Sequence, residues 1–171
     1  MKQLSNLIAK IVDVSGRVFG WLVPIMVLLI WYEVLMRYIA GQPPIIAEEL
    51  TAYMLVAVSF LGMAYTWRER GHVRVTALVS RLPTKVSNWL RLITLVLAFA
   101  FTIAITHSSY SYLAHSFRVG MVSSTYYRIP LQGPQMTILI GFILLALLLL
   151  VEITKAAIDM RAGKSIEEKV E

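Results

Sequence analysis

Four long apolar segments constrain the fold of this chain more than any other feature of its sequence. They lie at about 18–39, 46–67, 89–112 and 134–156, and each reaches the roughly 20 residues that an α-helix needs to cross a bilayer. The residues are 58% hydrophobic, whereas a soluble domain is nearer half apolar. The sequence therefore predicts an all-α integral membrane protein with four transmembrane helices, forming a single membrane domain over residues 1–171.

Two further segments have the pattern of amphipathic helices that lie along the membrane surface. In residues 1–17 and the residue that follows, apolar side chains recur on one face at helical spacing, at Leu4, Leu7, Ile8, Ile11 and Val18. Residues 72–82 repeat the pattern, with basic side chains opposite the apolar stripe, and Pro83 ends the helix. A helix packed on a partner subunit would show the same pattern at residues 1–17, so that alternative stays open. Residues 157–171 form a polar tail.

The basic residues are distributed unevenly about the four spans. Of the 16 lysines and arginines, 13 fall near the two termini or in and just after the connection at 68–88, as far as Arg91, and the other three are Arg37, Arg118 and Arg128. The positive-inside rule then places both termini in the cytoplasm. We expect phospholipid headgroups to bind the residues near the second connection, which are Arg68, Arg70, His72, Arg74 and Arg81.

Two groups of charged residues in or beside the spans are candidates for contact with a partner. Glu33 and Arg37 are four residues apart in the favourable order for a helical ion pair, toward the outer end of the first span. We interpret them mainly as a mutually neutralised pair facing a partner helix, with proton coupling through Glu33 as the alternative. Glu48 and Glu49 open the second span, where acids complement the helix dipole and could also meet a basic partner.

Other residue patterns argue against catalysis. The chain has no cysteine, and it shows no phosphate-binding loop, nucleophile–base set or metal-ligand cluster. His107 and His115 are two helical turns apart, too far to share one metal, and we interpret both as polar residues at the outer end of the third span. We therefore expect no catalytic residue, no cofactor and no metal site. The net charge of +6 follows from basic cytoplasmic segments, so no nucleic-acid partner is needed.

Several short motifs, taken in order, resemble the small membrane subunit of a TRAP (tripartite ATP-independent periplasmic) transporter. They are Arg37-Tyr38, Glu48-Glu49-Leu50, Phe60-Leu61-Gly62, Arg68 followed by Gly71-His72-Val73 and Val75, and Ile129-Pro130. The resemblance extends from the first span through the fourth. The chain departs from the family at Thr76, where an aspartate is usual, and at Pro44-Ile45-Ile46-Ala47, where an aromatic residue often precedes the paired acids.

The resemblance implies a scaffold role in the bacterial inner membrane. In such systems a periplasmic substrate-binding protein captures an organic acid, and a large membrane subunit moves it inward, driven by sodium. The small subunit packs on the large one. We expect the large subunit to be contacted by Glu33, which pairs with Arg37, and by the motif residues Arg37, Tyr38, Glu48, Glu49 and Gly62. Sodium coupling would reside in the large subunit. Sialic acid and C4-dicarboxylates are both candidate cargoes, because the binding protein selects the acid.

Two other classes of membrane protein remain as alternatives. A small multidrug exporter coupled to protons also has four spans and a glutamate in the first, here Glu33, but such exporters are shorter and often have a weak charge bias. A haem-carrying enzyme subunit would need histidines that face each other from separate helices. An assay of membrane orientation would test for the exporter, and an absorbance spectrum of the purified protein would test for haem.

Overall fold

The computed structural model describes residues 2–41, 44–69 and 83–161, and almost all of them are helical. The elements are α1 (Lys2–Gly20), α2 (Leu22–Leu35), a π-helical turn η1 (Met36–Ala40), α3 (Ile45–Arg68), α5 (Thr84–Val119) and α6 (Gln132–Arg161). Within these ranges there is no strand, only an isolated antiparallel bridge between Val122 and Pro130.

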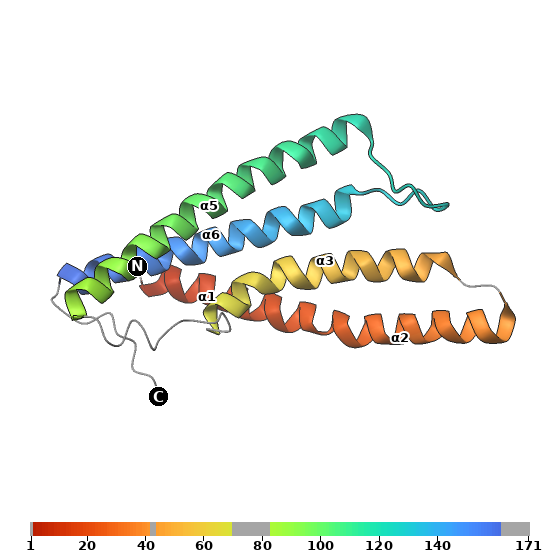
Figure 1. The fold of residues 1–171 in the computed structure, drawn as a ribbon, viewed down its shortest axis with the longest axis horizontal. Helices are drawn as coiled ribbons and strands as arrows, with labels where there is room; N and C mark the ends of the chain where they lie inside the picture. The colour runs from red at the N-terminus through yellow and green to blue at the C-terminus, as the bar shows by residue number, and fades with distance from the viewer. Residues whose placement is uncertain (1, 42–43, 70–82, 162–171) are drawn as a thin grey trace.

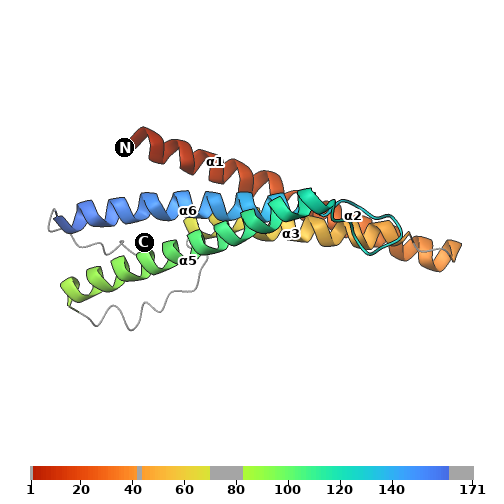
Figure 2. The same cartoon turned by 90° about the horizontal axis from the view of Figure 1, so that it is seen from above.

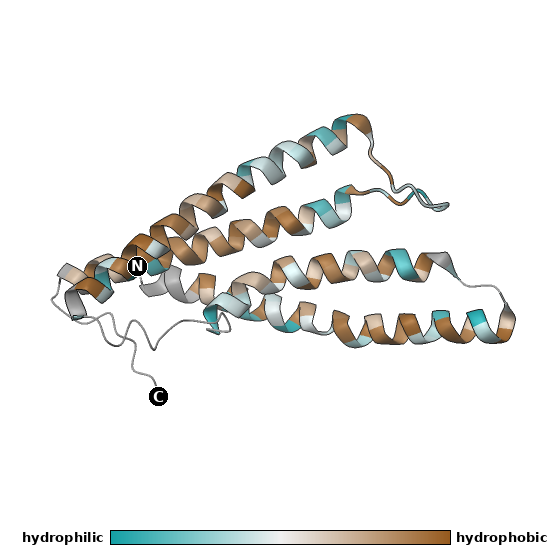
Figure 3. Ribbon diagram, in the orientation of Figure 1, coloured by the Kyte–Doolittle hydropathy of each residue, from teal (hydrophilic) through white to brown (hydrophobic). Residues whose placement is uncertain are grey.

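Four helical stretches are long and apolar enough to cross a membrane, which confirms the predicted number of spans. They are Leu7–Ala40, Ile46–Arg68, Val86–Val119 and Gln132–Ile158. Figure 3 shows hydrophobic residues along all of them. The chain is thus an all-α protein with four helices able to span a bilayer.

The spans form a single row and not a closed bundle. Among the described residues, α3 packs on α2 and α6, and α5 packs chiefly on α6. The order across the row is therefore α2, α3, α6, α5, as Figure 1 shows. Helix α1 packs on α3 and, less extensively, on α6, and Figure 2 shows it running obliquely beside the row toward the start of α2. Such a row leaves broad helix faces uncovered.

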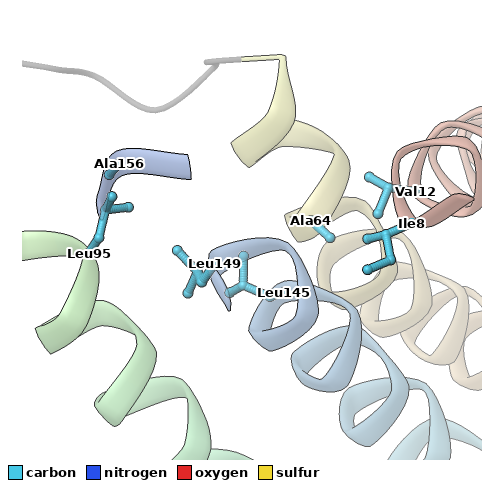
Figure 4. Close-up of a cluster of buried hydrophobic side chains, with 7 residues drawn as sticks. All are labelled: Ile8, Val12, Ala64, Leu95, Leu145, Leu149 and Ala156. Carbon is cyan, nitrogen blue, oxygen red and sulfur yellow. The ribbon is translucent and has the colours of Figure 1, made fainter. Parts of the chain in front are cut away.

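The largest cluster of buried side chains lies where α1 joins the row (Figure 4). Its members come from four helices and are Ile8, Val12, Ala64, Leu95, Leu145, Leu149 and Ala156. In a membrane, close packing drives helix association more than the hydrophobic effect does, because lipid tails are as apolar as leucine. The cluster therefore fixes the positions of α1, α3, α5 and α6 relative to one another.

Two glycines permit the closest helix contacts. A Cβ atom on Gly141 of α6 would lie 2.3 Å from the carbonyl oxygen of Phe60 in α3. A Cβ atom on Gly16 of α1 would lie 2.3 Å from Cγ of the Tyr65 ring, also in α3. Both distances are far inside van der Waals contact, so the α3–α6 and α1–α3 packing depends on the missing side chains.

The first span is separated from α1 by a break at Trp21. Helix α1 ends at Gly20 and α2 begins at Leu22. Pro24 has no N–H group to donate to the Gly20 carbonyl, and a proline is tolerated in the first turn of the helix that follows. The amphipathic helix thus extends to Gly20, three residues past its expected end at 17.

The third span is longer than the sequence predicted. We expected it to end near Tyr112, but α5 continues to Val119. No proline or glycine interrupts this stretch, and Gly120, with φ of +65°, then ends the helix in the left-handed conformation that glycine favours. The connection to α6 is correspondingly shorter than the expected 113–133 loop.

Basic side chains gather at one end of the row. The end of α3, the start of α5 and the end of α6 lie at the same end of the molecule as the start of α1 (Figure 1). Arg68, Arg91 and Lys155 belong to these helix ends, and Lys10 and Arg17 to α1. The fold therefore agrees with the grouping of charges used to predict orientation, while the side of the membrane stays a prediction.

Candidate partner-binding and membrane-facing sites

Glu33 and Arg37 form the ion pair that their spacing predicted. Nη2 of Arg37 donates to Oε1 of Glu33 over 2.5 Å. The Glu33 side chain is only 13% exposed, whereas that of Arg37 is 55% exposed. Tyr38 lies in the middle of η1 and is 84% exposed. The pair and the tyrosine thus lie where a second membrane protein could contact them, and that contact stays a prediction.

The two adjacent glutamates at the start of α3 have different environments. Glu48 is exposed, but Glu49 is 7% exposed. Oη of Tyr53 donates to Glu49 over 2.5 Å, and the Thr125 hydroxyl donates to the second carboxylate oxygen. Glu49 therefore ties the start of α3 to the connection between α5 and α6. The sequence grouped both acids as candidates for contact with a partner. The structure bonds Glu49 within the chain and leaves Glu48 exposed, and contact of either acid with a partner stays a prediction.

The α5–α6 connection is itself internally bonded. Val122 and Pro130 form the bridge, and the Ser123 amide donates to the Ile129 carbonyl over 2.8 Å. Ser123 Oγ also accepts a hydrogen bond from the Thr125 amide. These bonds hold Thr125 in place, and its hydroxyl donates the hydrogen bond that the Glu49 carboxylate accepts. Neither Tyr53 nor Thr125 was singled out from the sequence. Tyr53 is four residues after Glu49, a spacing that could have predicted their contact, whereas no local spacing connects Thr125 to Glu49.

Gly62 differs from the two glycines at close helix contacts. A Cβ atom there would meet nothing within 4 Å, so Gly62 makes no close helix contact within the described chain. Its helical position places it near Leu55, Ser59 and Thr66, all of which are exposed. This open, half-buried position is compatible with the predicted contact to a partner.

Arg68 is engaged within the chain. Its guanidinium pairs with Asp13 of α1, and Nη1 also donates to the Ala9 carbonyl over 3.1 Å. Next to it, Nε1 of Trp67 donates to Oε2 of Glu152 in α6 over 3.1 Å. The sequence assigned Arg68 to lipid phosphates and gave no role to Asp13 or Glu152. These polar contacts join α1, α3 and α6 at the basic end of the row.

Replacing Arg68 with alanine is expected to loosen α1 from α3. Both the Arg68 and Asp13 side chains are partly exposed, so we expect a modest cost of about 1 kcal/mol, or about fivefold in the opening of α1. The chain has no cysteine, so a Val12→Cys reporter at a fully buried site of α1 can measure this opening by its rate of thiol labelling. Lys155→Ala, at an exposed basic residue, is the control. An unchanged labelling rate in the Arg68 variant would show that this contact does not hold α1.

Helix α1 has a second apolar edge that is exposed among the described residues. Ile8 and Val12 point into the core, while Leu7, Ile11, Val14 and Val18 are exposed and line an open hollow. Lys10 and Ser15 also line this hollow. The residues are suited to contact with acyl chains beneath phosphate headgroups.

Several residues assigned to the membrane surface lie outside the described residues. These are Arg70, His72, Arg74 and Arg81, together with the predicted helix at 72–82. Residues 162–171 of the predicted polar tail are outside them as well, while its first part, to Arg161, continues α6.

His107 and His115 both lie on the exposed side of α5. Within residues 2–41, 44–69 and 83–161, no group of three or more histidine or acidic side chains could hold a metal ion.

Comparisons with known proteins identify relatives of this chain. A model of the family described as "Tripartite ATP-independent periplasmic transporters, DctQ component" matches residues 26–158. A curated Haemophilus influenzae protein, provisionally named a TRAP transporter small permease protein, is 30% identical over 83 residues. That match spans 48% of this chain and 50% of the relative, so the chain covers about half the length of the relative.

Proposed function

The chain belongs to the DctQ family of tripartite ATP-independent periplasmic (TRAP) transporter components, and from this premise we propose that it is a scaffold subunit for a larger membrane partner. In this role it packs on the large transport subunit and holds it in place in the bilayer. The large subunit moves an organic acid, driven by sodium, after a periplasmic binding protein has delivered it.

The single-row arrangement of the spans carries this proposal. Transporter sites usually form near the bilayer midplane between helices that surround them. Among the described helices, the two outer members of the row, α2 and α5, pack on α3 and α6 and not extensively on each other, so the spans do not form a closed ring. The polar groups Glu49, Arg68 and Glu152 are bonded to neighbouring elements of the chain. They therefore serve to hold helices together, and the broad uncovered faces are suited to a partner.

Orientation and lipid contact follow from the placement of charge. We infer that the basic end of the row faces the cytoplasm of a bacterial inner membrane, with both termini on that side. The exposed apolar edge of α1 would then rest among acyl chains, with Lys10 and Arg17 near phosphate groups. This contact would resist tilting of the scaffold.

In this proposal the other components of the transporter select the organic acid that is carried. Sialic acid and C4-dicarboxylates are the two cargo classes that the proposal includes. No acid-selective role is proposed for this chain, because Glu33, Glu49, Arg68 and Glu152 are all bonded within it. The periplasmic binding protein would select the cargo.

Reconstitution tests the scaffold role. The purified chain alone in proteoliposomes is expected to take up neither labelled sialic acid nor a labelled C4-dicarboxylate under an inward sodium gradient. Adding the large subunit and its cognate binding protein should produce uptake of one of them, and dissipating the sodium gradient should abolish it. Sodium-driven uptake by this chain alone would refute the proposal and make Glu33 a candidate for ion coupling.

A further inference from the structure

The outer half of α5 has exposed polar side chains that point away from the other helices of the row. His107, Ser108 and Ser111 are all exposed, on the side of α5 away from its contact with α6. Figure 3 shows this part of α5 as pale to teal, beside a brown stretch of α6. What surrounds this face depends on how deep in the bilayer it lies.

The packing of α5 on α6 defines that depth. Nε2 of Gln132 donates to the Ser116 carbonyl over 3.1 Å, so these residues are level across the antiparallel pair. Nine residues back along α5 is His107, and nine residues forward along α6 is Gly141. The core supports this register, because Leu95, twenty-one residues before Ser116, packs in one cluster with Leu149 and Ala156.

His107 is consequently level with the interior of two other spans. Gly141 lies against Phe60 of α3. Both residues are at least eight positions, about 12 Å, from either end of their apolar segments, Gln132–Ile158 and Ile46–Arg68. The register therefore indicates that the imidazole of His107 lies at the depth of the hydrocarbon, deeper than the outer end of the span where its sequence position placed it.

The hydrogen bonds of this face leave one group unsatisfied. Ser108 Oγ donates to the Ala104 carbonyl over 3.1 Å, and Ser111 Oγ donates to the His107 carbonyl over 3.0 Å. The His107 ring, in contrast, makes no hydrogen bond within the part of the chain that the structure describes. Ionisable side chains within membrane spans are costly in lipid, and they usually face protein or a water-filled space.

We propose that this face of α5, centred on His107, is covered by a transmembrane helix of the large membrane subunit. That helix presents a hydrogen-bonding side chain to the imidazole. Ala104, Ser108 and Ser111 have small side chains, which allow a second helix to approach closely. This inference rests on the proposed scaffold function and adds to it the helix face at which the partner docks.

A spin label attached at Ser108→Cys tests whether the large subunit covers the face of α5 that is centred on His107. The accessibility of the label to dissolved oxygen, which concentrates in lipid, is measured in nanodiscs with the chain alone and with the large subunit bound. The chain alone is the matched control and should give high accessibility. Binding of the large subunit should lower it. Equal accessibility in a complex that forms would overturn the docking face and leave the scaffold function intact.

Substitution of His107 provides the second measurement. His107→Leu should weaken binding of the large subunit by about tenfold, the effect of one interhelical hydrogen bond in a membrane, and His107→Gln should restore part of it. His115→Leu, on the same helix but level with Gly133 at the outer end, is the control and should leave affinity unchanged. Equal or tighter binding by His107→Leu would indicate a lipid-facing histidine and refute the inference.

Two other outcomes would also contradict it. A disulfide between two Ser108→Cys chains that persists when the large subunit is present would assign the face to a second copy. Failure of the wild-type chain to bind any large TRAP subunit would refute the scaffold function itself, and this inference with it.

Discussion

Replacing Gly141 with alanine is expected to destabilise the chain and to separate α6 from α3. The added Cβ atom would lie 2.3 Å from the Phe60 carbonyl oxygen and 2.6 Å from its carbon. These are backbone atoms, which cannot rotate away as a side chain could, so the helices must move apart. Overpacking of this kind typically costs about 1–3 kcal/mol. The midpoint of thermal unfolding in detergent, followed by size-exclusion profile, measures the loss.

Gly62→Ala is the matched control for this experiment. It makes the same chemical change in a neighbouring helix, at a position where the new atom meets nothing within 4 Å. Alanine is favoured over glycine in a helix by about 1 kcal/mol, so this variant should be as stable as the wild type or more stable. A Gly141→Ala variant that unfolds at the same temperature as Gly62→Ala would contradict the α3–α6 contact.

Replacing Glu49 with alanine is expected to detach the α5–α6 connection from α3. The change leaves the Tyr53 and Thr125 hydroxyl groups without the carboxylate that accepts their hydrogen bonds. Hydrogen bonds to a charged group are stronger than those between neutral groups, so the connection should open about tenfold more often. Hydrogen exchange of the amides at 121–131, read by mass spectrometry, measures this opening.

The neighbouring acid supplies the control for the Glu49 experiment. Glu48→Ala removes the same charge from the same helical turn, but its side chain is exposed and has no comparable contact in the described chain. We expect its exchange at 121–131 to match the wild type. If the amides at 121–131 exchange equally fast in the two variants, the contact between Glu49 and Thr125 does not hold the connection against α3.

The sequence by itself determined the class of protein and the content of its helices. Length and hydropathy predict four spans, because each apolar segment reaches the thickness of a bilayer. Spacing within one helix predicted the Glu33–Arg37 pair, because residues four apart are neighbours on any helix. Short motifs also predicted the family, which the match over residues 26–158 confirms.

Only the tertiary structure shows which of several similar residues makes a given contact. Glu48 and Glu49 are adjacent and alike in sequence, but only Glu49 reaches Thr125, seventy-six positions away. Among the glycines, the sequence singled out Gly62 as a contact with a partner, whereas Gly141 and Gly16 are the ones that lie against neighbouring helices of this chain. Periodicity gives the side of its own helix on which a residue lies, but not which helix lies opposite. The depth of His107 likewise depends on the register between α5 and α6, which the Ser116–Gln132 bond fixes.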